Sequence, residues 1–343
     1  MEILAPERYD ELEAFVSRHP RGEFTQSPRW RLVKNNWGYA AVVSRDGSGA
    51  IKGSMGVLIQ RVPYVGSSLL YAPRGPVCAV HDWETIADLK AGVDELARRE
   101  RAHEFKMDPD VPMADGTLIE KMKALGFRHS YGPEGFEGIQ ARFNYRLPLE
   151  GRDEAALLAN FSQSVRRNIR KAEKAGVEIR VCGHEQVEEF AAIMQVTGER
   201  DGFAVRPKAY FDRLLDALGE NVRLYGGFYE GKMISGAICT NYAGKACYVY
   251  GASDNSDRQV MPNYLMQWEM IRWALATGCR VYDFQGVSGN LDPNAHMYGL
   301  YRFKSGFRGE LDELAGEFDF VYRPAMKKLV DTAMEARKAL RRR

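Results

Sequence analysis

A run of positive charge marks one predicted helix in the second half of the chain. Its basic residues recur at helical spacing: Arg166, Arg167, Arg170, Lys171 and Lys174. Lys and Arg clustered in this way can bind phosphate groups, although the same pattern is typical of a solvated helix face. A second basic run, from Arg337 to Arg343, ends in KALRRR and can contact phosphates or a membrane surface, or be only a basic chain end.

Several other reaction chemistries lack their residues in this sequence. There is no GxSxG motif, no evident Ser-His-Asp set and no HExxH spacing among the six histidines. The five cysteines form no CxxC pair, which predicts reduced thiols in a cytoplasmic protein without a zinc site. We therefore expect no bound metal and no covalent intermediate on a side chain.

Length and composition bound the architecture. A chain of 343 residues predicts two domains of about 150 residues each. The hydrophobic content of 45% and charged content of 27% are typical of a soluble protein with a proper core, and the net charge of +2 does not by itself indicate nucleic acid. No apolar run approaches the roughly 20 residues of a membrane helix, and the acidic start MEILAPERYDEL lacks a signal-peptide pattern. We expect a cytoplasmic monomer with no integral membrane segment.

The elements that must position any site follow from apolar periodicity and turn residues. In the first half we expect helices over 7–19, 27–36, 82–101 and 116–127, and strands over 40–44, 52–62, 67–71, 104–110 and 138–149. In the second half we expect helices over 153–174, 184–203, 207–219, 263–279 and 324–341, and strands over 175–181, 222–229, 233–242, 246–253 and 280–286. The order helix, helix, antiparallel strands, helix, strand thus occurs twice, which predicts an α+β fold of two tandem GNAT-like acyltransferase domains.

Specific segments carry a family resemblance over nearly the whole chain. They are FTQSPRWRLVKNNWG (24–38), YAPRGPV (71–77), SVRRNIRKAEKAGVEI (164–179), YVYGAS (248–253), YDFQGVSGN (282–290) and GLYRFKSGFRGE (299–310). In these segments the chain resembles the FemXAB family of peptidoglycan-bridge aminoacyltransferases. The acidic-aromatic strand followed by GLYxFKxxF is the most specific feature.

The resemblance implies two GNAT-like domains, 1–147 and 148–321, with the final helix (322–343) packed back on the first. The interval 179–222 has room for two ordinary helices only, so the coiled-coil arm of some members is absent. The implied activity is transfer of an amino acid from aminoacyl-tRNA to the side-chain amine of a pentapeptide, in UDP-MurNAc-pentapeptide or a lipid-linked peptidoglycan precursor. No cofactor is implied.

By the same resemblance, Lys34 and Arg206 bind the precursor diphosphate, one from each half, in a cleft between the domains. Tyr210 and Tyr250 line the same precursor site. The alternatives are a solvated helix lysine for Lys34, an ordinary exposed arginine for Arg206, and core packing for the two tyrosines.

The implied reaction is aminolysis of an activated ester, which requires positioning, deprotonation of the amine and stabilisation of an oxyanion. Lys304 is the candidate for the oxyanion or for orienting the acceptor adenosine, and Phe303 for stacking on a base; the alternative for Lys304 is a strand lysine facing solvent. Asp108 is the candidate to contact the substrate amine or act as base, with a loop-capping role as the alternative. Arg166, Arg167, Arg170 and Lys171 are expected to contact the tRNA backbone.

Three rival functions remain open at this point. An acetyl-CoA-dependent N-acyltransferase would need an RxxGxG/A turn to hold the pyrophosphate, but Met261 and Asn263 stand where its glycines would be. A non-catalytic module that binds tRNA or precursor would not need the Phe303-Lys304 motif. A third possibility keeps the aminoacyl transfer and changes the acceptor to another amine.

Overall fold

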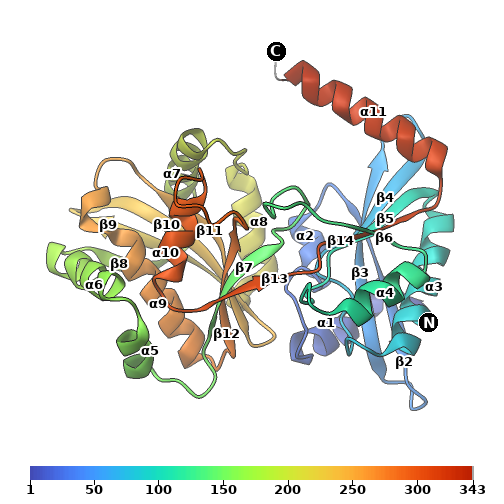
Figure 1. Cartoon of the computed structure of the whole chain (residues 1–343), viewed down its shortest axis with the longest axis horizontal. Coiled ribbons are helices and arrows are strands. Elements are labelled where there is room, and N and C mark those ends of the chain that lie inside the picture. Colours follow the sequence, from blue (N-terminus) through green and yellow to red (C-terminus); the bar gives the residue numbers. More distant parts are fainter. Residues whose placement is uncertain (342–343) are drawn as a thin grey trace. The chain divides into compact units, whose positions relative to one another are not determined.

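The structure is a computed structural model that describes residues 1–341, with side chains described through residue 336. The chain forms two compact units (Figure 1). Unit 1 consists of Met1–Gly132, Glu137–Arg142 and the chain from Glu313 onward, and unit 2 of Pro133–Phe136 and Phe143–Asp312. The basic run predicted at 337–343 lies outside the residues whose side chains are described.

Unit 1 is built on a seven-stranded sheet covered by helices. In sheet order its strands are β1 (Glu2–Leu4), β2 (Gly38–Arg45), β3 (Ile51–Val62), β4 (Ser67–Ala72), β5 (Ala102–Met107), β14 (Glu317–Val321) and β6 (Arg128–Ser130). Its helices are α1 (Tyr9–Arg18), α2 (Trp30–Val33), α3 (Trp83–Arg99), α4 (Gly116–Ala124) and α11 (Pro324–Arg341). Among the described strands of unit 1, only β4 and β5 pair in parallel, and the crossover between them is α3.

The sequence explains how α3 is placed. Asp82 caps its first turn by accepting the Thr85 N–H at 3.0 Å. Ile86, Leu89 and Val93 then recur at helical spacing and are buried in the core of unit 1, where they meet the sheet.

Unit 2 repeats this plan. In sheet order its strands are β13 (Glu310–Glu313), β7 (Phe143–Pro148), β12 (Val281–Val287), β11 (Lys245–Ser253), β10 (Lys232–Tyr242), β9 (Val222–Tyr229) and β8 (Glu178–Cys182). Its helices are α5 (Glu154–Asn160), α6 (Gln163–Ala175), α7 (Val187–Asp201), α8 (Lys208–Leu218), α9 (Pro262–Ala276) and α10 (Tyr298–Ser305). Here β11 and β12 pair in parallel, and α9 connects these two strands.

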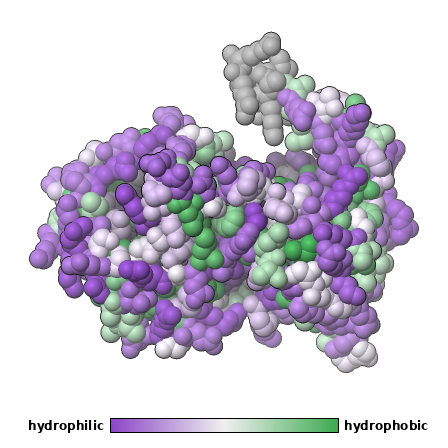
Figure 2. Space-filling view, viewed as in Figure 1, coloured by the Kyte–Doolittle hydropathy of each residue, from purple (hydrophilic) through white to green (hydrophobic). Residues whose placement is uncertain are grey.

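Short 3-10 turns complete the described elements: η1 (Pro6–Arg8), η2 (His184–Gln186), η3 (Gly219–Asn221) and η4 (Arg258–Val260). The predicted α+β class is confirmed. Most exposed residues on the face in Figure 2 are hydrophilic, and within residues 1–341 no helix is long and apolar enough to span a membrane.

In each sheet, the strand that follows the parallel pair in sheet order is far from that pair in the sequence. β7 precedes the rest of unit 2 yet pairs antiparallel with β12, while β14 follows unit 2 yet pairs antiparallel with β5. The unit boundary therefore falls at residues 142/143 and 312/313, whereas the predicted domains divided at 147/148 and 321/322. Strand pairing across long sequence separation, which periodicity cannot show, accounts for the difference.

Three other element predictions were wrong in part. The helix expected over 153–174 is interrupted at Phe161 and Ser162, which divide it into α5 and α6. The helix expected over 27–36 has α-helical geometry only at α2, because the chain turns at Lys34 to enter β2. The strand expected over 138–149 is confined to β7. Nothing in the apolar pattern had indicated α10, β13 or β14 as separate elements.

Candidate functional site

Lys304 lies on α10 and is almost completely buried, with 3% of its surface exposed. Its ammonium donates to three consecutive backbone carbonyls of β12, those of Phe284 at 2.6 Å, Gln285 at 3.3 Å and Gly286 at 2.8 Å. The alternative of a strand lysine facing solvent is therefore wrong. Burial lowers the pKa of Lys304 to about 7, and the charge of Asp283 opposes this effect.

These carbonyls are available because β12 leaves its parallel partner. The register of β11 with β12 ends at the pair Cys247 and Asp283, while β11 continues to Ser253 beside β10. Beyond that point β12 bulges against β7, and Gln285 adopts a left-handed φ of 62°. The centroid of the Tyr248 ring, on β11, lies 6.0 Å from the Lys304 ammonium. Lys304 thus occupies the point where the two parallel strands diverge.

Phe303 is held in an aromatic cluster. Its ring meets Tyr264 edge-on at 5.0 Å and Phe307 at 5.8 Å between centroids, and it is partly exposed. The structure thus brings Lys304 and Phe303 together on one short helix, with the lysine facing inward and the phenylalanine at the rim of the core. Whether Phe303 stacks on a base stays a prediction.

Arg206, Tyr210 and Tyr250 come together in unit 2. The Tyr250 hydroxyl donates to the Tyr210 hydroxyl at 3.1 Å, and the Arg206 guanidinium carbon lies 5.4 Å from the Tyr210 ring centroid. Tyr210 is buried, whereas Arg206 precedes α8 and is exposed, so its charge remains open to an anion. Burial raises the pKa of Tyr210, which remains a neutral phenol at physiological pH.

Lys34 belongs to unit 1. It ends α2, where its N–H donates to the Trp30 carbonyl at 3.0 Å, and its ammonium lies 5.5 Å from the Trp30 ring centroid. The side chain is half-buried rather than fully solvated.

Asp108 follows β5 and is buried. One carboxylate oxygen accepts the Tyr71 hydroxyl at 2.6 Å and the other accepts the Arg74 N–H at 2.7 Å. Burial raises the pKa of Asp108 to about 6, and the charge of Arg74 and these hydrogen bonds limit the rise. A carboxylate occupied by the YAPRG segment on both oxygens fits the loop-fixing alternative better than a base that must reach substrate.

The cations of α6 line a surface groove. The groove has a volume of about 920 Å³, and its other wall is the small and apolar face of α5: Ala155, Leu158 and Ala159. Arg166 is anchored to α5 through a 2.5 Å hydrogen bond to the Ala159 carbonyl. Among the described residues no ion pair or hydrogen bond engages the side chains of Arg167, Arg170, Lys171 and Lys174. The row therefore offers uncompensated positive charge.

The segment before α9 does not form a pyrophosphate cradle. Met261 lies at a left-handed φ of 60° directly before the helix, and Pro262 occupies its first turn. Proline removes one of the N–H groups that would face a phosphate, and the Met261 side chain takes the room that a glycine would leave.

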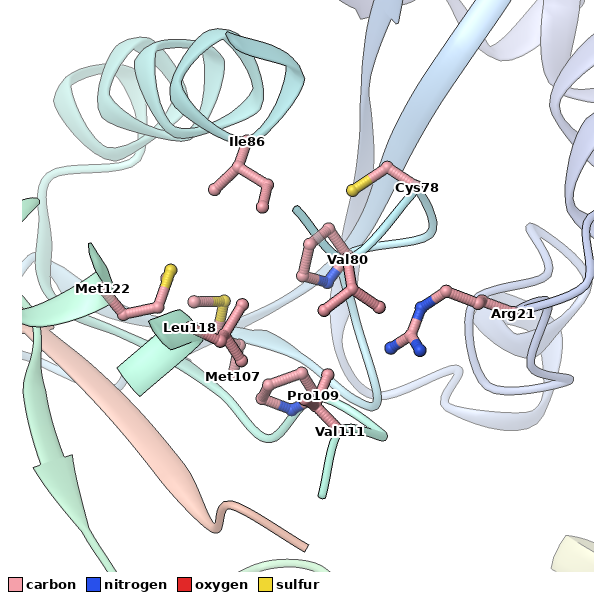
Figure 3. A pocket seen from close by; sticks show the side chains of 10 residues that line it. Arg21, Cys78, Val80, Ile86, Met107, Pro109, Val111, Leu118 and Met122 are labelled. Atoms are coloured by element: carbon pink, nitrogen blue, oxygen red, sulfur yellow. The ribbon is translucent and has the colours of Figure 1, made fainter. Parts of the chain in front are cut away.

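A small apolar cavity lies inside unit 1 (Figure 3). Figure 3 shows Ile86 of α3, Leu118 and Met122 of α4, and Met107 of β5 around it, with Arg21 at one side. Its volume of about 20 Å³ is room for about one water molecule, so it is too small to be a substrate site. The described residues contain no group of three His, Cys, Asp or Glu side chains placed to hold a metal.

Sequence reasoning missed the surroundings of Lys304. It did not identify the carbonyls of β12, the adjacent Asp283 or its partner Arg146, whose Nε donates to Asp283 at 2.8 Å. One signal was available, because Asp283 is an acidic residue within an otherwise apolar and aromatic strand, and a buried carboxylate requires a partner.

Comparison with known proteins identifies a family of similar sequence. A model of the FemAB family matches residues 8–225 and 229–335. The lipid II:glycine glycyltransferase of Staphylococcus aureus (strain USA300) is 29% identical over 395 aligned positions, which cover 94% of this chain and 93% of the relative. The alignment is longer than this chain, so the relative has residues without a counterpart here. Between β8 and β9 this chain has α7 and α8 as its two α-helices, as predicted.

Solved structures agree with the sequence comparison. The crystal structure of a FemX protein matches with a TM-score of 0.88 and 28% identity, covering 96% of this chain and all of that one. A tandem GNAT protein from the clavulanic acid biosynthesis pathway matches with a TM-score of 0.55 over 93% of this chain and 97% of its own, at 14% identity, which concerns the fold alone. The predicted tandem GNAT-like fold is confirmed.

Proposed function

The chain belongs to the FemAB family, and on this basis we propose that it transfers an amino acid from an aminoacyl-tRNA to an amine of a peptidoglycan precursor. The observation that carries the proposal is the buried ammonium of Lys304, held by backbone carbonyls where β11 and β12 diverge. A positive charge fixed in a site of low polarity stabilises an oxyanion more strongly than the same charge in water.

The reaction needs no side-chain nucleophile. The precursor amine attacks the ester carbonyl carbon, a new C–N bond forms, and the carbonyl oxygen becomes an oxyanion. The C–O bond to the tRNA ribose then breaks, and the proton released by the amine goes to the departing ribose oxygen. The activated ester supplies the driving force, so positioning and charge stabilisation are sufficient.

Lys304 has three N–H donors, and each is aimed at one carbonyl. The hydrogen bond to Gln285 is the longest, 3.3 Å against 2.6 and 2.8 Å, and it is the one that a substrate oxygen replaces most easily. In our proposal this donor turns to the oxyanion in the transition state, while the carbonyls of Phe284 and Gly286 keep the ammonium in place.

On the precursor side the proposal uses Arg206, Tyr210 and Tyr250 of unit 2, and Lys34 of unit 1 stays a candidate on the family resemblance alone. Arg206 offers an exposed guanidinium to a diphosphate. The Tyr210 ring packs against this guanidinium, and Tyr210 is itself held by its hydrogen bond with Tyr250. We propose a UDP-linked or lipid-linked precursor as acceptor. Because the Staphylococcus aureus relative is named for lipid II and glycine, lipid II and glycyl-tRNA are the first pair to test.

The tRNA side of the proposal rests on α6. Its cations lie at positions 167, 170, 171 and 174, so at 1.5 Å per residue they are spread over about 10.5 Å of the helix axis. A row of this length can meet more than one phosphate of a strand, a contact that is independent of base sequence. Aminoacyl-tRNA as donor also implies a cytoplasmic site of action.

An acetyl-CoA-dependent N-acyltransferase is disfavoured by Met261 and Pro262, which stand where the pyrophosphate would meet the start of α9. One measurement distinguishes the N-acyltransferase from the aminoacyltransferase. We expect calorimetric titration with acetyl-CoA to give no saturable isotherm at micromolar concentrations, and a stoichiometric isotherm would favour the N-acyltransferase.

The direct test is a transfer assay with a panel of charged tRNAs, each offered with UDP-MurNAc-pentapeptide and with lipid II in detergent. We expect mass spectrometry to show a precursor heavier by one or more aminoacyl residues with at least one tRNA. Arg180→Met, an exposed arginine of β8, serves as matched control and should retain activity. Absence of any product with both precursors and the whole panel would refute the proposal.

A further inference from the structure

A buried ion pair lies behind the Lys304 site. Asp283 of β12 is 1% exposed, and its Oδ2 accepts the Arg146 Nε of β7 at 2.8 Å. Arg146 is itself mostly buried, and its Nη1 lies 3.2 Å from Asp312. Asp283 and Arg146 are direct neighbours in the register of the two strands, so the pair bridges β7 and β12 where their regular pairing ends.

The same aspartate closes the bulge that carries the carbonyls. Its Oδ1 accepts the N–H of Gln285 at 2.7 Å. Gln285 has a left-handed φ of 62°, a strained conformation for a residue with a side chain, which persists only where the surroundings hold it. Without this turn the carbonyls of Phe284, Gln285 and Gly286 would alternate in direction along a regular strand, instead of meeting at one ammonium.

We propose that Asp283 and Arg146 are positioning residues: together they hold the β12 bulge in the one shape that presents three carbonyls to Lys304. The catalytic consequence rests on the function proposed above. The structural part does not, because it concerns only the geometry and charge state of Lys304 in the free protein.

The charge of the pair acts on Lys304 as well. Asp283 favours the charged form of the ammonium, against burial, and Arg146 partly neutralises Asp283. Other titratable or charged groups also lie on the elements around Lys304: Tyr145 on β7, Tyr282 on β12, Lys245, Cys247, Tyr248 and Tyr250 on β11, Tyr298, Tyr301 and Arg302 on α10, and Glu310, Asp312 and Glu313 on β13. The two members of the pair should therefore shift the titration of Lys304 in opposite directions when each is neutralised.

The experiment uses the full chain in three forms: unchanged, Asp283→Asn and Arg146→Met. The titration of Lys304 is followed by NMR of lysines labelled at the side-chain nitrogen and ε-carbon, with Lys304→Met to assign the signal. We expect Asp283→Asn to move the Lys304 titration to lower pH and Arg146→Met to move it to higher pH. In the transfer assay kcat of Asp283→Asn should fall about 10- to 100-fold with both KM values nearly unchanged, as for other residues that orient a reacting group.

Matched variants separate positioning from general destabilisation. Asp319→Asn breaks a partly buried ion pair of unit 1, to Lys106 at 2.5 Å, and should change neither the Lys304 titration nor kcat. Arg146→Lys keeps the charge and should restore most of the activity that Arg146→Met removes. Folding of each variant is checked by circular dichroism, and if Arg146→Met does not fold, Asp283→Asn and Arg146→Lys still decide the matter.

A Lys304 titration that stays in place in folded Asp283→Asn would overturn the proposal. If no variant transfers an amino acid but the NMR shifts occur as expected, the positioning role stands and the proposed function fails. If transfer occurs but the NMR shifts do not, the proposed function stands and the positioning role fails.

Discussion

The Tyr71 hydroxyl lies 2.6 Å from Asp108 Oδ2, and the Arg74 N–H lies 2.7 Å from Oδ1. Tyr71 is the penultimate residue of β4, and Arg74, at a left-handed φ of 57°, lies in the turn that follows β4 on the way to α3. Asp108 thus fixes the turn between two elements of unit 1 at a position with no exposed carboxylate. This arrangement has consequences that can be measured.

We expect Asp108→Asn to retain transfer activity within about tenfold, because an amide can still accept one of these hydrogen bonds.

The pH dependence of stability gives a sharper test. Burial raises the pKa of Asp108 to about 6 in the fold, above its ordinary 3.8, so its contribution to stability is present below about pH 4 and is lost as pH rises through 6. Relative to the unchanged protein, Asp108→Asn should gain about 2 kcal/mol of stability between pH 4.5 and 7.

Urea unfolding at several pH values between 4.5 and 7 measures this difference. Asp10→Asn, at an exposed position of α1, is the control for the substitution itself. A loss of activity beyond a thousandfold in stable Asp108→Asn would instead return Asp108 to the reaction as a base.

Much of the fold was accessible from the sequence because its strands and helices are strongly patterned. Ile86, Leu89 and Val93 on α3, for example, recur at helical spacing and are all buried. The basic face of α6 could be read for the same reason. Arg206 and Tyr210 were candidates only through the family resemblance, because Arg206 lies before α8 and not on it.

The site around Lys304 could not be derived in this way. Its partners are backbone carbonyls of β12 about 20 positions away. They converge only because β12 has a bulge at Gln285 in its pairing with β7. Backbone groups carry no sequence signal, and the pairing of Arg146 with Asp283 spans more than 130 residues. For the same reason the return of β14 to unit 1 was not predicted.

Arg206→Met and Lys34→Met should each weaken use of the precursor and leave tRNA use nearly unchanged. A charge-assisted contact to a diphosphate contributes about 1.5–3 kcal/mol, so the precursor KM should rise about 10- to 150-fold. Steady-state kinetics with each substrate varied in turn measures this, and Tyr250→Phe, which removes the hydrogen bond to Tyr210, should raise the same KM more modestly. An unchanged precursor KM in both charge variants would remove them from the site.

Neutralising Arg170 and Lys171 together should reduce tRNA affinity without regard to the tRNA's identity. For each phosphate that the helix no longer neutralises, the slope of log affinity against log salt should become smaller by about 0.7–0.9. The double variant to Gln should therefore have a slope smaller by about 1.4–1.8, measured by filter binding between about 50 and 200 mM salt. The same change at Lys121 and Lys123 of α4 is the control, and an equal effect there would mean that only net charge matters.

Lys304→Met should lower kcat about 100- to 1,000-fold and leave the affinities for precursor and tRNA nearly intact, because the ammonium acts on charge that exists only in the transition state. Lys304→Arg should recover part of this loss, since a planar guanidinium cannot meet three convergent carbonyls as a compact ammonium does. Single-turnover kinetics with preformed aminoacyl-tRNA isolates the chemical step. A raised tRNA KM with unchanged kcat would make Lys304 a phosphate anchor instead.

The same variant should also change how stability depends on pH. Burial lowers the pKa of Lys304 from its ordinary 10.5 to about 7, so the fold carries no penalty above pH 10.5 and the full penalty below about 7. The stability of Lys304→Met relative to the unchanged protein should therefore rise as pH falls from 9.5 to 7, by about 3 kcal/mol. The carbonyls left without a donor reduce stability equally at both pH values, so they cancel in this comparison. A difference that does not vary with pH would show that Lys304 keeps an ordinary pKa in the folded protein, and an ordinary, fully charged lysine would have no titration for Asp283 to tune near neutral pH.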